Sequence, residues 1–324
     1  MLASVGLDSG SLGRLYPADP AAREVAHSSL IERLIAHGVV VFGSDADRDE
    51  FFQRIRDLPG PLKSLWSAGM ERIAYRTFAR QVELTLSELV EGMGDLGTTW
   101  NGVADVAFVE RSRAVALGLP LTQAATNTDS GVEVVRMEQV DASHVIAGLQ
   151  QMAYRALHAG ESRDALWAER FGPVAAHTAK VTIVDRYAMD DHHRWLEKGK
   201  DSGLQWLLDQ CVKNGVLHAH LITRAKTQKR TYEELLALRA YVGGLASLTV
   251  TFIPEAAFRD AGHARHVRFD MWAFSLDKGC EVFAKPITAA ESPCQYGDAK
   301  SLRRREHALE QAAVADELRQ RVWP

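Results

Sequence analysis

Short apolar runs rich in valine alternate with helical patterns along the first half of the chain. β-Branched residues favour extended backbone, so we expect these runs to be strands. The expected strands are 38–42, 103–109 and 132–137. Segments 22–37 and 45–58 have the apolar spacing of helices, and Ser44 is placed to cap the second one. This alternation of strands and helices predicts an α/β domain.

The second half of the chain shows the same alternation. The expected strands are 180–185, 216–223, 248–253, 266–274 and 280–284, with helices at 203–214 and 231–241. A loop rich in His, Asp and Lys is expected at 186–200. Three consecutive strands after two β-α units predict a second α/β domain with a mixed sheet flanked by helices.

Chain length and segment boundaries divide the sequence into two domains with flanking pieces. A length of 324 residues suits about two domains. We expect a flexible arm at 1–20, an α/β domain at 21–172, a second α/β domain at 178–290 and a helical tail at 291–324. The role expected for the first domain is to sense or bind a protein partner.

Composition and charge narrow the choice of partners. The formal net charge is −4, from 38 Lys and Arg against 42 Asp and Glu, so the chain does not coat nucleic acid or membranes by bulk attraction. Any anionic ligand must therefore bind a local patch. The three widely spaced cysteines predict neither a disulfide framework nor a zinc site. The first residues lack a basic start followed by an apolar run, so we expect a cytoplasmic protein.

The candidate catalytic residues lie in one segment, Gly262-His263-Ala-Arg265-His-Val-Arg268-Phe-Asp270. Residues i and i+2 of a strand face the same side, so His263 and Arg265 are expected to project together toward a phosphate. An imidazole can attack phosphorus, a guanidinium can hold the phosphoryl oxygens, and a carboxylate can orient an imidazole. The alternative is an exposed edge strand whose cations pair with acidic neighbours.

His263-x-Arg265 followed by four residues and Asp270 resembles the His-x-Lys-x4-Asp signature of the phospholipase D superfamily, with Arg in place of Lys. Upstream, Val181-Thr-Ile-Val-Asp185-Arg-Tyr187, a helix and a second strand resemble the elements that precede the histidine-bearing strand in that superfamily. Trp272, Leu276-Asp-Lys-Gly279 and Phe283-Ala-Lys-Pro286 are similar to the carboxy-terminal phospholipase-D-like domain of eukaryotic MIT-domain cytokinesis proteins. The similarity spans residues 180–286, about a third of the chain.

This resemblance implies a phospholipase-D-like C-terminal domain and two possible activities. Asp270 stands where the eukaryotic domain has Asn, which favours a metal-independent phosphodiesterase, a nuclease of a bacterial antiphage defence or conflict system. Only one signature is present, and the chemistry uses two histidines, so the resemblance implies a homodimer. The Gly-Ser-x-Asn element of active members is not evident. The alternative is therefore a non-catalytic adaptor that binds phospholipid headgroups or a protein partner, as the eukaryotic domain does.

Further residues are expected around the same cleft, with no metal and no cofactor. The substrate-binding candidates are Arg268, His218, His220, Arg224, Lys226, Arg230, Asp185, Tyr187 and Glu281. The cations of 224–230 follow a central strand, where open α/β sheets usually bind ligands, although a solvated loop explains them equally well. His218 and His220 are explained equally well as a hydrogen-bonded, partly buried pair. For His192 and His193 we expect a solvated loop rather than a metal site.

Overall fold

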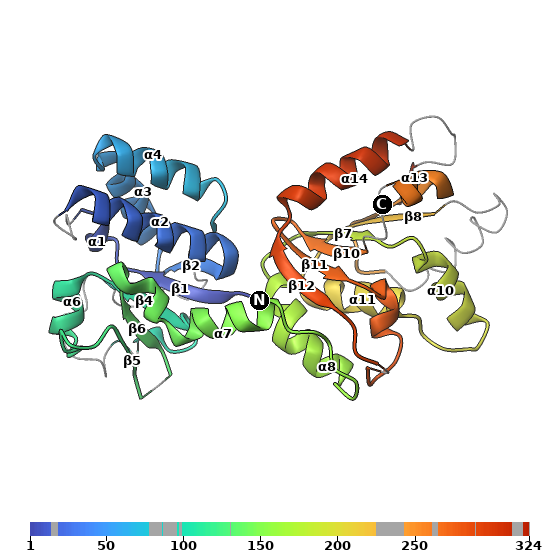
Figure 1. Cartoon of the computed structure of the whole chain (residues 1–324), viewed down its shortest axis with the longest axis horizontal. Coiled ribbons are helices and arrows are strands. Elements are labelled where there is room, and N and C mark those ends of the chain that lie inside the picture. Colours follow the sequence, from blue (N-terminus) through green and yellow to red (C-terminus); the bar gives the residue numbers. More distant parts are fainter. Residues whose placement is uncertain are drawn as a thin grey trace. The chain divides into compact units, whose positions relative to one another are not determined.

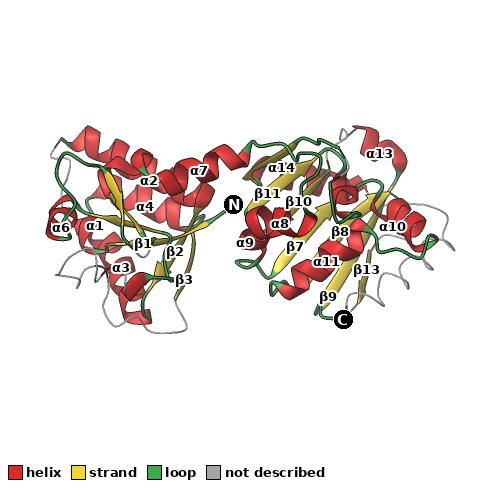
Figure 2. Cartoon of the chain, turned by 90° about the horizontal axis from the view of Figure 1, so that it is seen from below, coloured by secondary structure: helices red, strands yellow, loops and turns green. Residues whose placement is uncertain are grey.

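A computed structural model describes most of the chain. The described residues are 1–13, 19–77, 86, 96, 99–129, 131–224, 243–260, 265–288, 290–312 and 320–323. The chain forms two compact units: the N-terminal unit, Leu2–Gln151, and the C-terminal unit, Met152–Pro324 together with Met1. Each unit is a mixed sheet flanked by helices (Figures 1 and 2), which confirms the expected α/β class.

The sheet of the N-terminal unit has the strand order β3-β2-β1-β4-β6-β5, and all neighbours are parallel except β5 and β6. Its strands are β1 (Ala3–Leu7), β2 (Gly38–Phe42), β3 (Ala74–Thr77), β4 (Val106–Val109), β5 (Ala125–Asn127) and β6 (Glu133–Arg136). The helices are α1 (Gly10–Gly13), α2 (Pro20–His37), α3 (Asp45–Asp57), α4 (Gly60–Met70), α6 (Arg111–Ala116), the 3₁₀ segment η1 (Met137–Ala142) and α7 (His144–Ala153).

Local sequence explains where the helices of this unit begin. The Ser44 hydroxyl accepts a hydrogen bond from the Asp47 backbone N–H at 3.1 Å, which satisfies a free donor at the start of α3. At the start of α7, the buried Glu133 carboxylate accepts from the His144 N–H at 2.7 Å and from the Ser143 hydroxyl. A carboxylate at this place also suits the positive end of the helix dipole.

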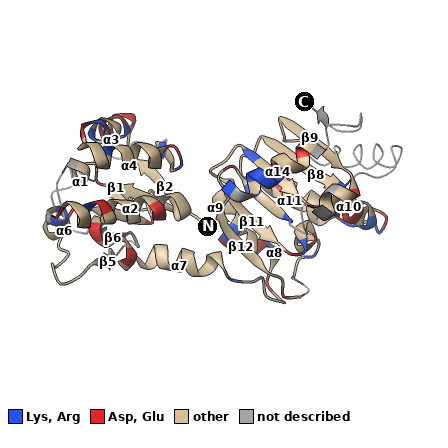
Figure 3. Cartoon of the chain, turned by 45° about the horizontal axis from the view of Figure 1, so that its top comes forward, with Lys and Arg blue, Asp and Glu red and all other residues tan. Residues whose placement is uncertain are grey.

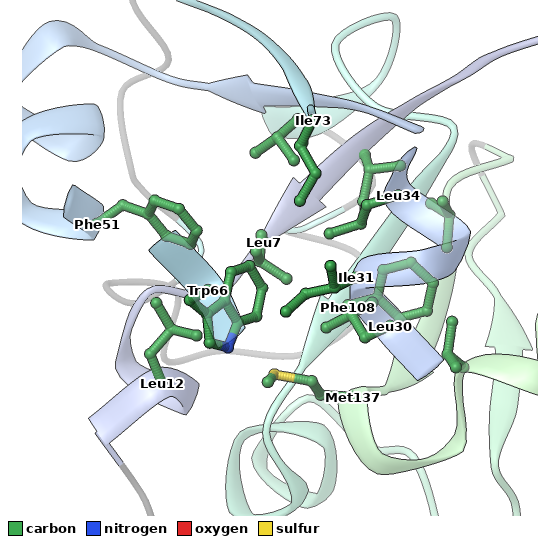
Figure 4. Close-up of a cluster of buried hydrophobic side chains, with 14 of the residues drawn as sticks. Leu7, Leu12, Leu30, Ile31, Leu34, Phe51, Trp66, Ile73, Phe108 and Met137 are labelled. Carbon is green, nitrogen blue, oxygen red and sulfur yellow. The ribbon is translucent and has the colours of Figure 1, made fainter. Parts of the chain in front are cut away.

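The core of the N-terminal unit lies between the sheet and helices α2, α3 and α4. Leu7, Leu30, Phe51, Trp66 and Phe108 are among the buried side chains that meet there (Figure 4). The buried Trp66 indole N–H donates to His27 Nδ1 at 3.0 Å, so the polar atom of the largest core side chain has a partner.

The prediction of a flexible arm at 1–20 is wrong for its first part. Residues 3–7 form β1, which pairs with β2 on one side and β4 on the other. The five letters Ala-Ser-Val-Gly-Leu give a weak strand signal, because Ser4 and Gly6 interrupt the apolar run. Burial between two neighbouring strands stabilises β1, and that burial is a tertiary effect.

The C-terminal unit has a seven-stranded sheet of order β12-β11-β10-β7-β8-β9-β13, in which only β7, β8 and β9 are mutually parallel. The strands are β7 (Lys180–Val184), β8 (His218–Arg224), β9 (Ser247–Ile253), β10 (His266–Phe269), β11 (Trp272–Leu276), β12 (Cys294–Asp298) and β13 (Gln320–Trp323). The helical segments are α8 (Arg163–Leu166), the π-turn η2 (Trp167–Phe171), α9 (Gly172–Ala175), α10 (Ala188–Leu196), α11 (Gly203–Lys213), α13 (Glu255–Asp260), the 3₁₀ segment η3 (Gly279–Phe283) and α14 (Lys300–Ala312).

The two faces of this sheet differ in chemistry. One face packs aromatic side chains: the Phe171 ring lies 4.2 Å from the Phe274 ring, and the Trp167 ring lies 6.4 Å from the Phe269 ring. On the other face, the buried Glu306 of α14 accepts hydrogen bonds from His266 at 2.9 Å and Arg268 at 2.8 Å. A charged network of this kind positions α14 on the sheet.

Several expected elements of the C-terminal unit need correction. Segment 186–200 contains helix α10, and 280–284 belongs to the 3₁₀ segment η3 rather than a strand. The expected strand 266–274 is a hairpin, β10 and β11, with a turn at Asp270. The boundary between the units lies at 151–152, and the expected tail contributes β12, α14 and β13 to this unit. The expected helix 231–241 lies outside the described residues.

Candidate functional site

One edge of the C-terminal sheet collects several of the predicted site residues. The parallel strands β7, β8 and β9 end at this edge, and the antiparallel β10 begins there. Asp185 follows β7, Arg224 ends β8, Glu255 lies two residues beyond β9 and Arg265 precedes β10. Ligands of open α/β sheets bind outside the carboxyl ends of parallel strands, so this edge is the candidate site.

Asp185 is the buried anion of this site, with an exposed fraction of 1%. Its two carboxylate oxygens accept backbone hydrogen bonds from Tyr187 at 2.9 Å and from Cys280 at 2.8 Å. Arg265 Nε lies 4.0 Å from Asp185 Oδ1. Burial raises the pKa of Asp185, and the two backbone donors and Arg265 oppose that rise. Asp185 therefore positions Arg265 and joins β7 to η3.

The ring of Tyr187 is surrounded by three guanidinium groups. The guanidinium carbon of Arg265 lies 5.0 Å from the ring centroid, and those of Arg186 and Arg224 lie 5.1 Å from it. A cation near the face of an aromatic ring gains from the ring quadrupole. Tyr187 thus holds three positive charges close together at the end of the sheet.

Carboxylates already pair with these cations. Glu255 pairs with both Arg186 and Arg224, and its side chain is 39% exposed. Asp190 of α10 pairs with Arg224 as well. Acidic and basic residues accordingly lie close together around α10 (Figure 3). An incoming anion must therefore displace a carboxylate, and the half-exposed Glu255 is the accessible one.

Two further carboxylates lie at the side of this cluster. Burial, and after it the Glu281 carboxylate, raises the pKa of Asp191 to about 6. Arg194 Nη2 lies 2.8 Å from Asp191 Oδ1 and opposes the rise. A carboxyl group whose pKa is raised in this way is typical of functional sites. Arg186 and Glu255 were missed from the sequence. Their positions, directly after Asp185 and just after β9, are the signals that indicate them.

Gly279 allows the backbone to pack closely against Asp185 and Arg265. It has a φ of +58°, and a Cβ there would lie 2.0 Å from Asp185 Oδ2 and 2.9 Å from Arg265 Cδ. Glycine meets both demands, since it tolerates left-handed backbone and leaves room for the carboxylate. The start of η3 therefore packs directly against Asp185 and Arg265.

The proposed nucleophile is not among the described residues. His263, Lys226 and Arg230 all lie outside them. The described strand β10 begins at His266, and Arg265 just before it accepts a backbone hydrogen bond from the Leu276 N–H of β11 at 2.9 Å. The expectation that His263 and Arg265 share a face of one strand concerns His263 and so lies outside the described residues.

The structure does not bring Asp270 to this site. Asp270 lies at the opposite end of β10 from Arg265, in the two-residue turn to β11, with a φ of +48°. Its carboxylate pairs with Arg303 of α14 at 3.0 Å, and its side chain is 63% exposed. Asp and Asn tolerate such turn positions better than most residues. This turn accounts for Asp270 here, so the carboxylate loses its expected supporting role.

Three other expected site residues also have structural partners elsewhere. Arg268 binds Glu306 and donates to the Thr182 hydroxyl at 2.9 Å on the α14 face. His220 pairs with the Thr251 hydroxyl at 2.8 Å on the same face, and burial lowers its pKa to about 4. His218 lies at the start of β8, away from Arg224, and pairs with Ser247 at 2.8 Å. Both histidines are hydrogen-bonded, but only His220 is partly buried, because His218 is exposed.

The α10 histidines do not form a metal centre. His192 is buried against the Ser202 hydroxyl at 2.6 Å, and His193 pairs with Glu197 at 2.9 Å. Within the described ranges, no group of three His, Cys, Asp or Glu side chains is arranged to hold a metal ion. The expected solvated loop is replaced by a helix with one buried histidine.

In the N-terminal unit, the topology singles out a residue that the sequence did not suggest. Asp8 follows β1, where the order of strands reverses between β1 and β4, and it is 1% exposed. Its N–H donates to the Phe108 carbonyl at 3.0 Å, and its carboxylate accepts from the Gly10 N–H at 2.9 Å. Such a switch point is the usual ligand edge of open α/β sheets. In the sequence, the short apolar run before Asp8 was the only indication that this residue follows a strand.

Comparisons with known proteins assign no family. No family model and no curated protein matches the sequence. Among solved structures, the chain is similar to TrmBL2, described as an archaeal chromatin protein with a novel mode of DNA binding. The match has 10% identity and a TM-score of 0.25, and it covers 52% of this chain and 55% of that one. The match thus spans about half of each chain, and a TM-score this low does not establish a shared fold. Separately, none of the described helices has the length and apolar character needed to cross a bilayer.

Proposed function

We propose that the C-terminal unit is a phospholipase-D-like domain that binds a phosphodiester at the Arg265 edge of its sheet. The observation that carries this proposal is the gathering of three guanidiniums, those of Arg186, Arg224 and Arg265, around the Tyr187 ring. Guanidinium groups bind phosphate oxygens in fork geometry, with charge-assisted hydrogen bonds. The segment bearing His263 lies directly before Arg265 in the chain.

In this proposal the phosphate replaces Glu255. The Glu255 carboxylate already bridges Arg186 and Arg224, so it occupies the place that two phosphoryl oxygens would take. Since the Glu255 side chain is 39% exposed, it can turn to solvent without uncovering a buried charge. Asp185 is buried and held by two backbone donors, so it stays and positions Arg265.

The proposed reaction is hydrolysis of a nucleic-acid phosphodiester without a metal. The imidazole of His263 attacks phosphorus, a nitrogen–phosphorus bond forms, and the bond to the leaving oxygen breaks. The protonated His263 of a second copy donates its proton to that oxygen. Water then hydrolyses the phosphohistidine and returns the proton. The use of two histidines makes a homodimer part of the proposal.

The alternative is a non-catalytic adaptor for phospholipid headgroups or a protein partner. One observation favours it: Asp270, which would complete the catalytic signature, lies in a hairpin turn and pairs with Arg303. The guanidinium cluster serves this alternative equally well, because a headgroup phosphate makes the same contacts.

Cleavage assays in EDTA separate the two functions. We expect the purified protein to cleave single-stranded DNA or RNA, and His263→Ala and Arg265→Ala to abolish cleavage. Arg303→Ala, which removes an exposed cation of α14 outside the site, is the matched control and should retain activity. No cleavage by the wild type, together with Arg265-dependent binding to vesicles of anionic phospholipid, would establish the adaptor instead.

Oligomeric state tests the mechanism independently. Light scattering should give the mass of a dimer at assay concentrations. A strict monomer that still cleaves substrate would contradict the two-histidine mechanism, because a single copy supplies only one signature histidine.

A further inference from the structure

A pocket beside the proposed phosphate site has the size and walls of a binding site for one planar ring system. It offers about 170 Å³, and its walls include Trp195 of α10, Val282 of η3, Ile287 and Thr288. This is less than the roughly 300 Å³ at which pockets for drug-sized ligands begin. A single heterocycle fits this space, whereas a whole nucleotide or a lipid chain does not.

The pocket and the proposed phosphate site share one turn of the chain. Lys278 and Glu281 line the pocket. The two residues between them face the phosphate site: the Gly279 Cα packs against Asp185 and Arg265, and the Cys280 N–H donates to Asp185 at 2.8 Å. A ligand that binds Arg265 through a phosphate therefore has the pocket on the other side of this turn.

Thr288 forms one wall of the pocket. It is only 6% exposed, and its hydroxyl oxygen is enclosed. Its backbone is fixed on both sides, because its N–H donates to the Glu161 carbonyl at 2.8 Å and its carbonyl accepts from the Gly160 N–H at 2.9 Å. Thr288 therefore gives the pocket a wall of fixed position.

The chemistry of the remaining walls indicates the ligand. The half-buried Trp195 indole offers a stacking surface, and Lys198 Nζ lies 5.7 Å from its centroid. Lys278 and Lys285 offer donors, and Glu281 offers an acceptor. Nucleobases have a flat π-face with donors and acceptors along the edge, and stacking on aromatic side chains is the usual way proteins hold unpaired bases.

We propose that this pocket binds one unpaired nucleobase adjacent to the phosphate at Arg265, which makes single-stranded nucleic acid the substrate class. The inference rests on the proposed function, since it supplies the base-binding part of the same site. Double-stranded substrates do not meet this requirement, because their bases are stacked and paired and must be extruded before they reach a pocket.

Calorimetric titration with small probes tests the base subsite separately from the phosphate site. Adenosine 5′-monophosphate should bind about tenfold more tightly than ribose 5-phosphate or glycerol 3-phosphate, given the stacking strength of aromatic side chains. Trp195→Ala should remove this preference, and Trp195→Phe should keep most of it. Thr288→Val, which replaces the enclosed hydroxyl by a methyl of similar size, is the matched control and should keep the preference.

The outcomes separate the two proposals. If all three phosphates bind alike and Arg265→Ala abolishes their binding, the base subsite is wrong and the phosphate site stands. If binding of every phosphate is unchanged in Arg265→Ala, the proposed function itself fails. Ribose 5-phosphate should bind wild type and Trp195→Ala equally, which shows that Trp195→Ala is folded. A nucleotide preference that survives in Trp195→Ala would overturn the assignment of this pocket.

Discussion

Replacement of Glu306 by glutamine should destabilise the C-terminal unit strongly. The Glu306 carboxylate is the shared acceptor of His266 and Arg268, and its side chain is 6% exposed. Glutamine keeps the shape but removes the charge, so Arg268 remains buried without an anionic partner. Loss of one partner of a buried ion pair costs about 3–5 kcal/mol.

The pKa of Glu306 gives a second measure of the same energy. Burial alone would raise this pKa, but hydrogen bonds from His266 and Arg268 lower it to about 2 from an ordinary value of 4.5. At about 1.4 kcal/mol per pKa unit, the network contributes about 3 kcal/mol at neutral pH. Because the folded pKa is depressed, this contribution is complete above about pH 4.5. It is lost as the pH falls through about 2.

Urea unfolding at pH 7 and at pH 3 measures both effects. We expect Glu306→Gln to lower the free energy of unfolding by about 3 kcal/mol at pH 7, with a smaller difference at pH 3. Hydrogen exchange in 266–276 and 300–312 should show that the loss falls in the C-terminal unit. Glu310→Gln is the matched control: it lies one turn further along α14, is 39% exposed, and should change stability by less than about 1 kcal/mol.

Two results would refute this reasoning. A loss below about 1 kcal/mol at pH 7 would mean that the network is not the buried ion pair described. An equal loss at both pH values would mean that the glutamine acts through packing rather than through charge.

Three further predictions concern the site and its surroundings. Gly279→Ala should abolish phosphate binding and lower the melting temperature in a thermal-shift assay. The control is Gly199→Ala, at φ +63° but in open space, which should lower the free energy of unfolding by only about 1 kcal/mol and leave binding intact. Asp270→Asn should leave the rate of cleavage in EDTA within twofold of wild type; a loss of a hundredfold would restore a catalytic role to this carboxylate. Burial raises the pKa of all three cysteine thiols, Cys211, Cys280 and Cys294, so they should react slowly with alkylating agents. Intact-mass measurement after iodoacetamide treatment at pH 8 without denaturant should therefore show no alkylation.

Elements with strong local signals were predictable. Valine-rich β2 has the predicted bounds, and the Ser44 cap and early carboxylates of α3 placed that helix to within a residue of its observed end. Strand β7 was predicted to within one residue for the same reason, since a continuous apolar run bounded by polar residues indicates a buried strand.

Two elements were predicted wrongly for different reasons. Helix α10 is so rich in charged residues and histidine that its sequence resembled a loop, although its buried residues Ala188, Met189 and His192 recur at helical spacing. That signal was local and was overlooked. The turn at Asp270 was hidden because β10 and β11 have similar composition on both sides of it, and only strand pairing reveals it.

The sequence by itself determined the α/β class, most strands and helices, and the suggestion that Asp185, Tyr187, Arg224 and Arg265 belong together. The class and the elements follow from local periodicity. The grouping of the four residues follows from the place of Arg224 at a strand end and from the resemblance to the phospholipase D signature. The tertiary structure decided which cations lie at the candidate site. It assigned Arg268 to Glu306 and Asp270 to Arg303, and it added Arg186 and Glu255. Strand order and helix packing set these pairings, because they bring together side chains that are far apart in the sequence.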